Sequence, residues 1–279
     1  MTGRRNFFIS NRISLFLLMI AATLFLAVVT ALGQVWGEEA AVVDFSRKNL
    51  LPCASHVFGT DWMGRDMFTR TITGLSLSIR IGILTAMVSA VLAFLLGTLA
   101  AVTEKWVDGL ICSLIDVIMG IPHILLLILI SYACGKGFWG VAAGVALTHW
   151  TSLARLIRGE VLQLKESNYV KIAEKLGHGR WYIACHHMAP QLLPQFIIGL
   201  ILLFPHAVLH EASITFLGFG LSPEQPAIGI ILSESMAYLA MGKWWLALFP
   251  GLLLLTTVMM FHFLGQGLLR LLDPGSVHE

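Results

Sequence analysis

The stretch ISLFLLMIAATLFLAVVTAL, residues 13–32, carries no charged side chain. At about 1.5 Å per residue, a helix of about 20 residues crosses the roughly 30 Å hydrocarbon layer of a bilayer. Arg4, Arg5 and Arg12 precede the stretch, an arrangement that secretory signal peptides share. The apolar core of a signal peptide, however, is usually only about 7–15 residues long. We therefore expect residues 13–32 to form a retained first membrane-spanning helix.

Further apolar stretches downstream also have the length of membrane-spanning helices. The composition agrees, because 57% of the residues are hydrophobic and only 12% are charged. A soluble domain carries roughly 25% charged residues, so much of this surface must face lipid. We predict an all-α polytopic membrane protein with six transmembrane helices. The expected spans are residues 13–33, 76–102, 111–133, 138–157, 192–212 and 246–269.

The distribution of positive charge predicts the orientation. Most of the bias comes from a cluster of Lys and Arg at residues 155–180, and short basic loops stay in the cytoplasm. With this loop inside, six spans place both termini in the cytoplasm of a bacterial cell, the protein being embedded in inner-membrane lipid. The net charge of +2 is too small to suggest a nucleic-acid partner.

Several other classes of function receive little support from the sequence. The chain contains no GxxxxGK[ST] phosphate-binding loop, so ATP-driven transport would need a separate ATPase polypeptide. No internal repeat is evident, which disfavours the secondary transporters built from inverted repeats. The four cysteines form no CxxC pair, so no zinc or redox site is indicated. A secondary transporter driven by an ion gradient and a purely structural membrane protein are the alternatives.

The polar segment at residues 158–190 holds the most informative pattern. Val170, Ala173 and Leu176 recur at three-residue spacing with charged residues between them, which predicts a short amphipathic helix. Gly177 permits a sharp turn, because helix C-terminal caps often need a positive φ. A second helical piece is expected to end before Pro190. The alternative is a helix that lies on the membrane surface.

This segment resembles the EAA-x3-G-x9-I-x-L-P loop of ABC importer permeases, and more closely the YVxAAxxLG…HILP variant of their peptide/nickel branch. Lys171 and Ile172 replace the first Glu and Ala of the general pattern, and Ala189 replaces its Leu. In that family the loop docks into a groove on the ATPase subunit. The resemblance implies an ATPase-coupling loop that includes Tyr169, Val170, Ala173, Glu174, Leu176, Gly177, His187 and Pro190.

Residues 59–70, GTDWMGRDMFTR, resemble the GTDxxGRDxxSR signature of the second permease of peptide and nickel importers. Thr69 in place of Ser is the only departure. Taken alone, the segment is a turn at the outer face in which Asp61, Arg65, Asp66 and Arg70 can pair, and ion pairing is favoured over contact with substrate. The motif residues are Gly59, Asp61, Gly64, Arg65 and Asp66.

Residues 211–221, EASITFLGFGL, resemble the EAxLSFLGLG segment of the same family, and the resemblance covers residues 1–279. It implies the type I ABC importer permease fold, with an N-terminal helix and outer segment at 1–75. The transmembrane domain would occupy 76–279 and contain the coupling loop at 158–190. The implied partners are a homologous permease subunit in a heterodimer, two ATPase subunits, and a periplasmic or lipid-anchored substrate-binding protein. The chain itself would bind no cofactor and perform no bond chemistry, since ATP-Mg belongs to the ATPases.

The histidines are the residues that bear on the identity of the cargo, because ionisable groups at membrane depth are rare and are candidates for function. His206 and His210 are four residues apart and share one helical face. Two imidazoles can bind one ion such as Ni²⁺ or Zn²⁺; the alternative is that each histidine only hydrogen-bonds to a neighbouring helix. Histidines within or near the predicted spans are His123, His149, His206, His210 and His262, and the expected substrate path contains His149, His206, His210 and Glu211.

The segments around these histidines resemble nickel-import permeases more than dipeptide permeases. We therefore expect the chain to form half of the membrane path for nickel or a nickel chelate, with dipeptides or oligopeptides as the alternative cargo. His210-Glu211 also begins like the HExxH motif of zinc metalloproteases. The second ligand position is Ile214, so an intramembrane metalloprotease is disfavoured.

Overall fold

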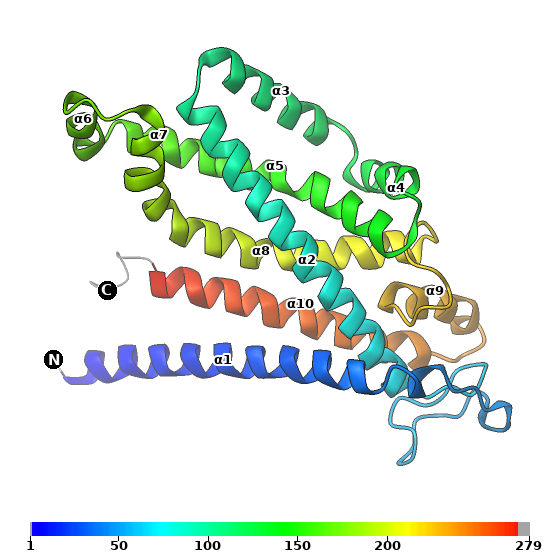
Figure 1. Ribbon diagram of the computed structural model, residues 1–279. Coiled ribbons are helices and arrows are strands. Elements are labelled where there is room, and N and C mark those ends of the chain that lie inside the picture. Colours follow the sequence, from blue (N-terminus) through cyan, green and yellow to red (C-terminus); the bar gives the residue numbers. More distant parts are fainter. Residues whose placement is uncertain (1, 273–279) are drawn as a thin grey trace.

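The structure, a computed structural model, describes the backbone of residues 2–272 and the side chains of residues 15–271. The described residues form helices and no β-strand, as predicted, and the long helices lie side by side in one bundle (Figure 1). Lipid offers no hydrogen-bond partners, so a chain that crosses it must satisfy its backbone groups within each helix. The all-α architecture follows from that requirement.

The predicted spans correspond to the long helices of the bundle. Four helices are long and apolar enough to cross a membrane, and a bent pair, α3 with α4, gives a fifth candidate. The elements are α1 (Thr2–Val35), η1 (Glu39–Ala41), η2 (Phe45–Arg47), α2 (Met67–Val102), α3 (Lys105–Gly120), α4 (His123–Ala133), α5 (Gly137–Lys165), α6 (Asn168–Lys175), α7 (Arg180–Ile183), η3 (Ala184–Met188), α8 (Ala189–Phe216), α9 (Ile228–Leu239) and α10 (Trp245–Leu272).

Helix α5 covers the remaining predicted span, residues 138–157, and packs along α2 and α8. Ala93 of α2 and Ala154 of α5 are fully buried, and the Ser89 hydroxyl donates a hydrogen bond to the Ala146 carbonyl at 2.9 Å. Small side chains let two helix backbones approach closely within a membrane. Because neighbouring helices cover α5, it needs a less apolar surface than α1 or α10.

The span predicted at residues 111–133 is not one straight helix, because the chain bends there by 101° between α3 and α4. Ile121 adopts an extended conformation, with φ −90° and ψ 138°. A residue before proline disfavours the helical conformation, and Pro122 offers no N–H to continue the ladder. The Ile121–Pro122 pair therefore separates the two helices.

The prediction that the second helical piece ends before Pro190 is wrong, since the chain is helical from Arg180 through Phe216. A turn of π-helix, η3, precedes Pro190, which lies in the first turn of α8. The first turn of a helix tolerates proline, and a π-turn changes the register of the preceding carbonyls.

Two further elements differ from the prediction. Helix α9 was not predicted. Helix α2 begins at Met67 and runs across the predicted boundary at residue 75.

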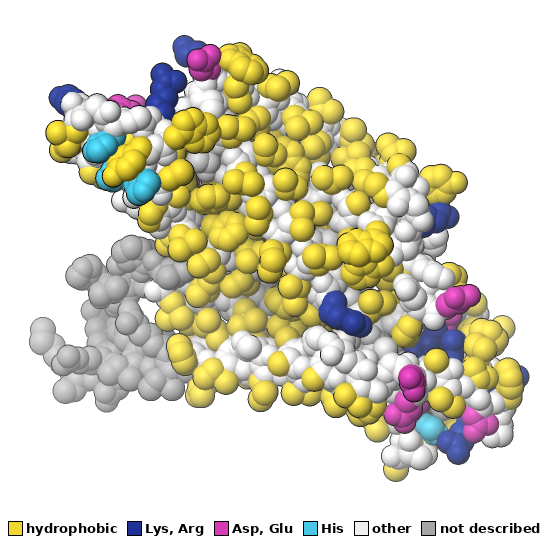
Figure 2. Space-filling view, viewed as in Figure 1, with side chains coloured by type: hydrophobic (Ala, Val, Ile, Leu, Met, Phe, Trp, Pro, Cys, Tyr) yellow, Lys and Arg dark blue, Asp and Glu magenta, His cyan; other side chains and the backbone are white. Residues whose placement is uncertain are grey.

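The two ends of the bundle carry different features. The first turn of α1, the last turn of α10 and α6–α7 lie at one end, whereas residues 36–66 and α9 lie at the other (Figure 1). Charged side chains gather toward these ends, and the flank between them is largely hydrophobic (Figure 2). The first turn of α1 and the last turn of α10 therefore share one end of the bundle with the loop at 158–190.

Two ion pairs fasten α3 to α5. Asp108 accepts two hydrogen bonds from Arg158, at 2.5 Å from Nε and 2.6 Å from Nη2. Asp116 and Arg155 form a single contact at 2.6 Å, but both side chains are more than half exposed. The Asp108–Arg158 pair is the stronger of the two, because its two hydrogen bonds fix the orientation of both the guanidinium group and the carboxylate.

We expect Asp108→Ala to lower the free energy of unfolding by about 1 kcal/mol or more, and Asp116→Ala by less than about 0.5 kcal/mol. The double variant Asp108→Arg/Arg158→Asp should recover part of the loss, because it restores opposite charges. Thermal melting of the detergent-solubilised protein measures all three. Equal losses for the two single variants would contradict this account.

Candidate functional site

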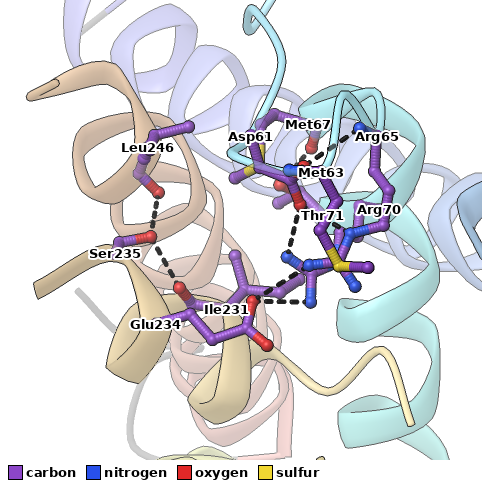
Figure 3. Close-up of polar contacts among 10 residues, drawn as sticks. All are labelled: Asp61, Met63, Arg65, Met67, Arg70, Thr71, Ile231, Glu234, Ser235 and Leu246. Carbon is purple, nitrogen blue, oxygen red and sulfur yellow. Dashed lines mark hydrogen bonds and ion pairs between the residues drawn. The ribbon is translucent and has the colours of Figure 1, made fainter. Parts of the chain in front are cut away.

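Asp61 lies at the centre of an ion-pair network at the start of α2 (Figure 3). Its side chain is 2% exposed, and its Oδ2 accepts hydrogen bonds from Arg65 Nε at 2.6 Å and Arg70 Nη1 at 3.1 Å. Glu234 of α9 faces the same arginines, its Oε2 lying 2.8 Å from Arg70 Nη2 and 3.3 Å from Arg65 Nη2. The expected pairing of Asp61 with both arginines is therefore present. Two carboxylates therefore balance the charge of two guanidinium groups, and charges that are removed from water need such partners.

The backbone around Asp61 is shaped to hold its other oxygen. Asp61 Oδ1 accepts hydrogen bonds from the backbone N–H groups of Met63 at 2.8 Å and Arg65 at 3.0 Å. Gly64, between them, has φ +79°, and a Cβ there would lie 1.8 Å from the carbonyl oxygen of Asp44. Only glycine meets both requirements. The Gly and Asp of this motif thus build one tight turn.

Asp66 has a different role from the one that charge alone suggested. Its Oδ1 accepts the backbone N–H of Thr69 at 2.9 Å, which caps the first turn of α2. Its Oδ2 lies 2.7 Å from His56 Nδ1. The carbonyl of Gly59 accepts the N–H of Met67 at 3.0 Å. Gly59 and Asp66 therefore fix where α2 begins, and contact of this motif with a substrate-binding protein or cargo stays a prediction.

Sequence reasoning missed Glu234, which lies 169 positions from Arg65. The neighbouring Ser235 fixes its helix, because the Ser235 hydroxyl donates to the Ile231 carbonyl at 2.6 Å and lies 2.7 Å from the Leu246 carbonyl (Figure 3). The motif at 59–70 holds two arginines and two aspartates, so its charges balance within the segment. No signal in the sequence therefore pointed to a further acid.

A cavity of about 810 Å³ lies among α3, α4, α5 and α8. This volume is in the range of sites that bind small molecules. The Ile121–Pro122 break forms part of its wall, together with Thr151, Ser152 and Leu156 of α5. Broken helices are tolerated at membrane depth where they are buried in protein or line a water-filled cavity. The bend and the cavity are thus parts of one feature.

Three histidines from three helices meet at this cavity. The ring centroids of His123 and His149 are 4.7 Å apart, those of His123 and His210 4.5 Å, and those of His149 and His210 4.9 Å. His149 Nε2 lies 3.2 Å from His210 Nδ1. One ring nitrogen from each residue lies within 4.8 Å of the other two. We call His123, His149 and His210 the histidine cluster.

The predicted pair of His206 and His210 is arranged differently. The His206 side chain is exposed on the cavity wall, and its backbone carbonyl accepts a hydrogen bond from His210 Nδ1 at 2.8 Å. The helix spacing places the two residues on one face, but the structure groups His210 with residues of other helices. Metal binding by the 206/210 pair stays a prediction.

Glu211, the remaining residue of the expected substrate path, is fully buried. Its Oε1 accepts a hydrogen bond from the Thr215 hydroxyl at 3.0 Å, and it is not among the residues that line the cavity. In this conformation Glu211 packs between helices, so its contact with cargo also stays a prediction.

The loop at 158–190 contains the predicted short helix, α6, followed by a turn at Gly177 with φ +87°. Val170 and Ala173 are buried, but Leu176 is 73% exposed, because α6 ends before it. Trp181 of α7 is 59% exposed. Val170 and Ala173 therefore anchor α6 to the rest of the chain, whereas Leu176 and Trp181 leave an apolar surface exposed.

The other residues assigned to this loop lie around that anchor. The Tyr169 hydroxyl donates a hydrogen bond to Gln191 at 3.0 Å, and the ring of His187 lies 5.9 Å from that of Tyr182. Glu174 lines a smaller, polar cavity beside α7. These contacts join α6 to the start of α8.

Residues 93–277 match the family described as binding-protein-dependent transport system inner membrane component. The chain belongs to this family. It is accordingly a multi-pass permease subunit of an ABC importer and not an enzyme, which removes the metalloprotease alternative.

Particular relatives match most of both chains. The chain is 31% identical to the dipeptide transport system permease protein DppC of Bacillus subtilis over 252 residues, covering 90% of this chain and 79% of that protein. It is 33% identical to the glutathione transport system permease protein GsiD of Pectobacterium atrosepticum over 231 residues, covering 83% of this chain and 76% of that protein. Its fold is similar to a chain of the MetNI methionine ABC transporter in an inward-facing conformation. That match has a TM-score of 0.62 and 16% identity, and covers 74% of this chain and 98% of the other.

We expect Arg70→Ala to destabilise the protein by about 3 kcal/mol or more, because it leaves the buried carboxylate of Asp61 short of a partner. Arg80→Ala is the matched control, since Arg80 is an exposed arginine of the same helix. The yield of monodisperse protein and its melting temperature measure both. If Arg70→Ala were as stable as Arg80→Ala, the network would not hold this end of the bundle together.

Proposed function

We propose that this chain forms one half of the membrane path of a binding-protein-dependent importer for short peptides. The supporting observation is its similarity, over most of both chains, to permeases named for dipeptide and glutathione transport. These relatives favour the second cargo expected from the sequence, peptides, over the first, nickel or a nickel chelate. A cavity of about 810 Å³ is large enough for part of a small peptide.

The exposed cavity supports a second permease subunit as partner. The wall includes the exposed side chains of Ser152 and His206, and polar and ionisable groups at membrane depth normally face a protein interior or water rather than lipid. A homologous subunit, packed against this face as a heterodimer, would close the path. A periplasmic or lipid-anchored binding protein would deliver cargo to its outer mouth.

Loop charge supports the orientation. Lys165, Lys171, Lys175 and Arg180 lie in or beside α6 and α7, and such basic loops stay in the cytoplasm. The first turn of α1 and the last turn of α10 then lie on the cytoplasmic side, because they share this end of the bundle (Figure 1). The Asp61 network and α9 lie on the periplasmic side.

The same loop is suited to carry motion from two ATPase subunits, which would bind ATP-Mg. Leu176 and Trp181 present exposed apolar surface, a feature of interaction sites. The helix is continuous from Arg180 to Phe216, and its later turns carry His206 and His210 on the cavity wall. A displacement of the loop would therefore move the wall of the path as a rigid body.

We expect Leu176→Glu and Trp181→Glu each to weaken ATPase binding at least about 10-fold, as for apolar anchors of an interface. Met241→Glu is the control, because Met241 is 68% exposed at the opposite end of the bundle. Co-purification of the ATPase subunits with the tagged permease measures binding. ATPase recovery that fell equally with Met241→Glu would contradict the loop assignment.

The cargo is tested by uptake of a radiolabelled dipeptide into cells that carry the complete transport system, with and without this chain. We expect uptake to depend on the chain and on an active ATPase. Nickel uptake that required the chain, together with dipeptide uptake that did not, would overturn the peptide proposal and restore the nickel interpretation. ATPase-independent uptake would favour a secondary transporter.

A further inference from the structure

The histidine cluster brings one nitrogen from each of three rings close enough together to serve one metal ion. Metal–nitrogen bonds to imidazole are about 2.0–2.1 Å long, so two ligands of one tetrahedral ion lie about 3.3 Å apart. One nitrogen of each of the three rings lies within 4.8 Å of the other two. Side-chain rotations that shorten these separations would place three ring nitrogens around one ion.

The hydrogen bonds of the cluster leave ring nitrogens available as ligands. His149 Nδ1 lies 2.9 Å from the carbonyl of Val145, and His210 Nδ1 lies 2.8 Å from that of His206. A carbonyl oxygen can only accept, so each of these Nδ1 atoms carries the hydrogen and donates it. The Nε2 atom of each neutral ring then keeps its lone pair. Metal-bound histidines typically donate their second N–H to a backbone carbonyl in this way.

His123 supplies an independent observation. Its Nε2 is buried and has no hydrogen-bond partner among the described residues. A buried polar atom without a partner is uncommon and indicates a missing water or ion. His123 opens α4 directly after the Ile121–Pro122 break, so the bend of the chain brings this nitrogen to the cavity. Ring packing accounts for the contacts among the three rings, but it does not explain the unpaired nitrogen of His123.

The chemistry of the ligands selects the class of ion. Neutral imidazoles suit Zn²⁺, Ni²⁺, Cu²⁺ and Co²⁺ and not the oxygen-preferring Mg²⁺ or Ca²⁺. Three protein ligands leave at least one coordination position open, and the cluster borders the cavity of the membrane path. Another ligand can therefore come from a molecule in that cavity, such as the amino or carboxylate group of a peptide.

We infer that His123, His149 and His210 together bind a divalent transition-metal ion, and that the cargo includes peptides or similar chelators that carry such an ion. The first clause stands on the cluster itself, and the second rests on the proposed import function. The ion passes through as part of the cargo and is held by the cluster on its way.

The test uses the assembled transporter in lipid nanodiscs, with Co²⁺ as a spectroscopic probe and Zn²⁺ and Ni²⁺ measured by mass spectrometry after gel filtration. We expect one ion per copy of this chain, with the visible absorption of nitrogen-coordinated Co²⁺. His149→Ala and His210→Ala should each weaken binding by more than about 100-fold, since even second-sphere partners of a metal contribute about 10–100-fold. His123→Ala should remove the same absorption.

Two control variants separate this site from other histidines. His262→Ala, on α10, should leave binding unchanged, and so should His206→Ala, whereas a site made by the 206/210 pair would lose the ion. If His149→Ala did not assemble, His149→Gln and His123→Ala would carry the test. Binding of none of the three ions by the wild type, or equal binding by the cluster variants, would overturn the inference.

The outcome is separable from that of the cargo proposal. Dipeptide uptake that depends on the chain but leaves no ion on the cluster would keep the proposed function and refute the site. An ion on the cluster without any dipeptide uptake would keep the site and refute the peptide proposal.

Discussion

The constraint on which this structure depends is that backbone groups in lipid must be bonded within helices. Among the described residues one pair of apolar helices departs from a straight crossing, α3 with α4, at the Ile121–Pro122 break. The break does not face lipid alone, because it lines the cavity shared by α5 and α8. The Ile121–Pro122 break, where helical hydrogen bonds are interrupted, therefore lies beside the cavity and the polar side chains that line it.

The two ends of the bundle are built to be stiff around that cavity. At one end, Asp61 and Glu234 hold two arginines and so tie residues 36–66 and α9 to the start of α2. At the other, buried Val170 and Ala173 anchor α6, and the continuous helix from Arg180 to Phe216 leads to the cavity wall. A bundle whose ends are tied together around a cavity suits a path that opens and closes by movement of whole helices.

The sequence predicted those features that arise within one short segment. The apolar runs predicted α1, α2 and α10, since hydrophobic length alone identifies a span. The ion pairs of Asp61 with Arg65 and Arg70 were also predicted, because the three residues lie within ten positions. Gly177 and α6 followed from local spacing.

Features that join distant segments escaped the sequence analysis. Glu234 completes the Asp61 network from another helix, and no local pattern marks it. His206 and His210 share a helix face, yet the structure groups His210 with His123 and His149 across three helices. The angle at Pro122 and the π-turn before Pro190 depend on how the surrounding helices pack, which one sequence without its tertiary contacts does not determine.

The central claim is that the cavity bordered by the histidine cluster is the membrane path. Ser152 is exposed on its wall, so Ser152→Cys, in a chain whose four native cysteines are replaced, reports access to it. The rate of labelling by a membrane-impermeant thiol reagent can be measured in inside-out vesicles that contain the whole transporter. We expect labelling to differ between the nucleotide-free and the ATP-bound, vanadate-trapped transporter, because the cavity opens to different sides of the membrane in the two states. Labelling that was absent or equal in both states would contradict it.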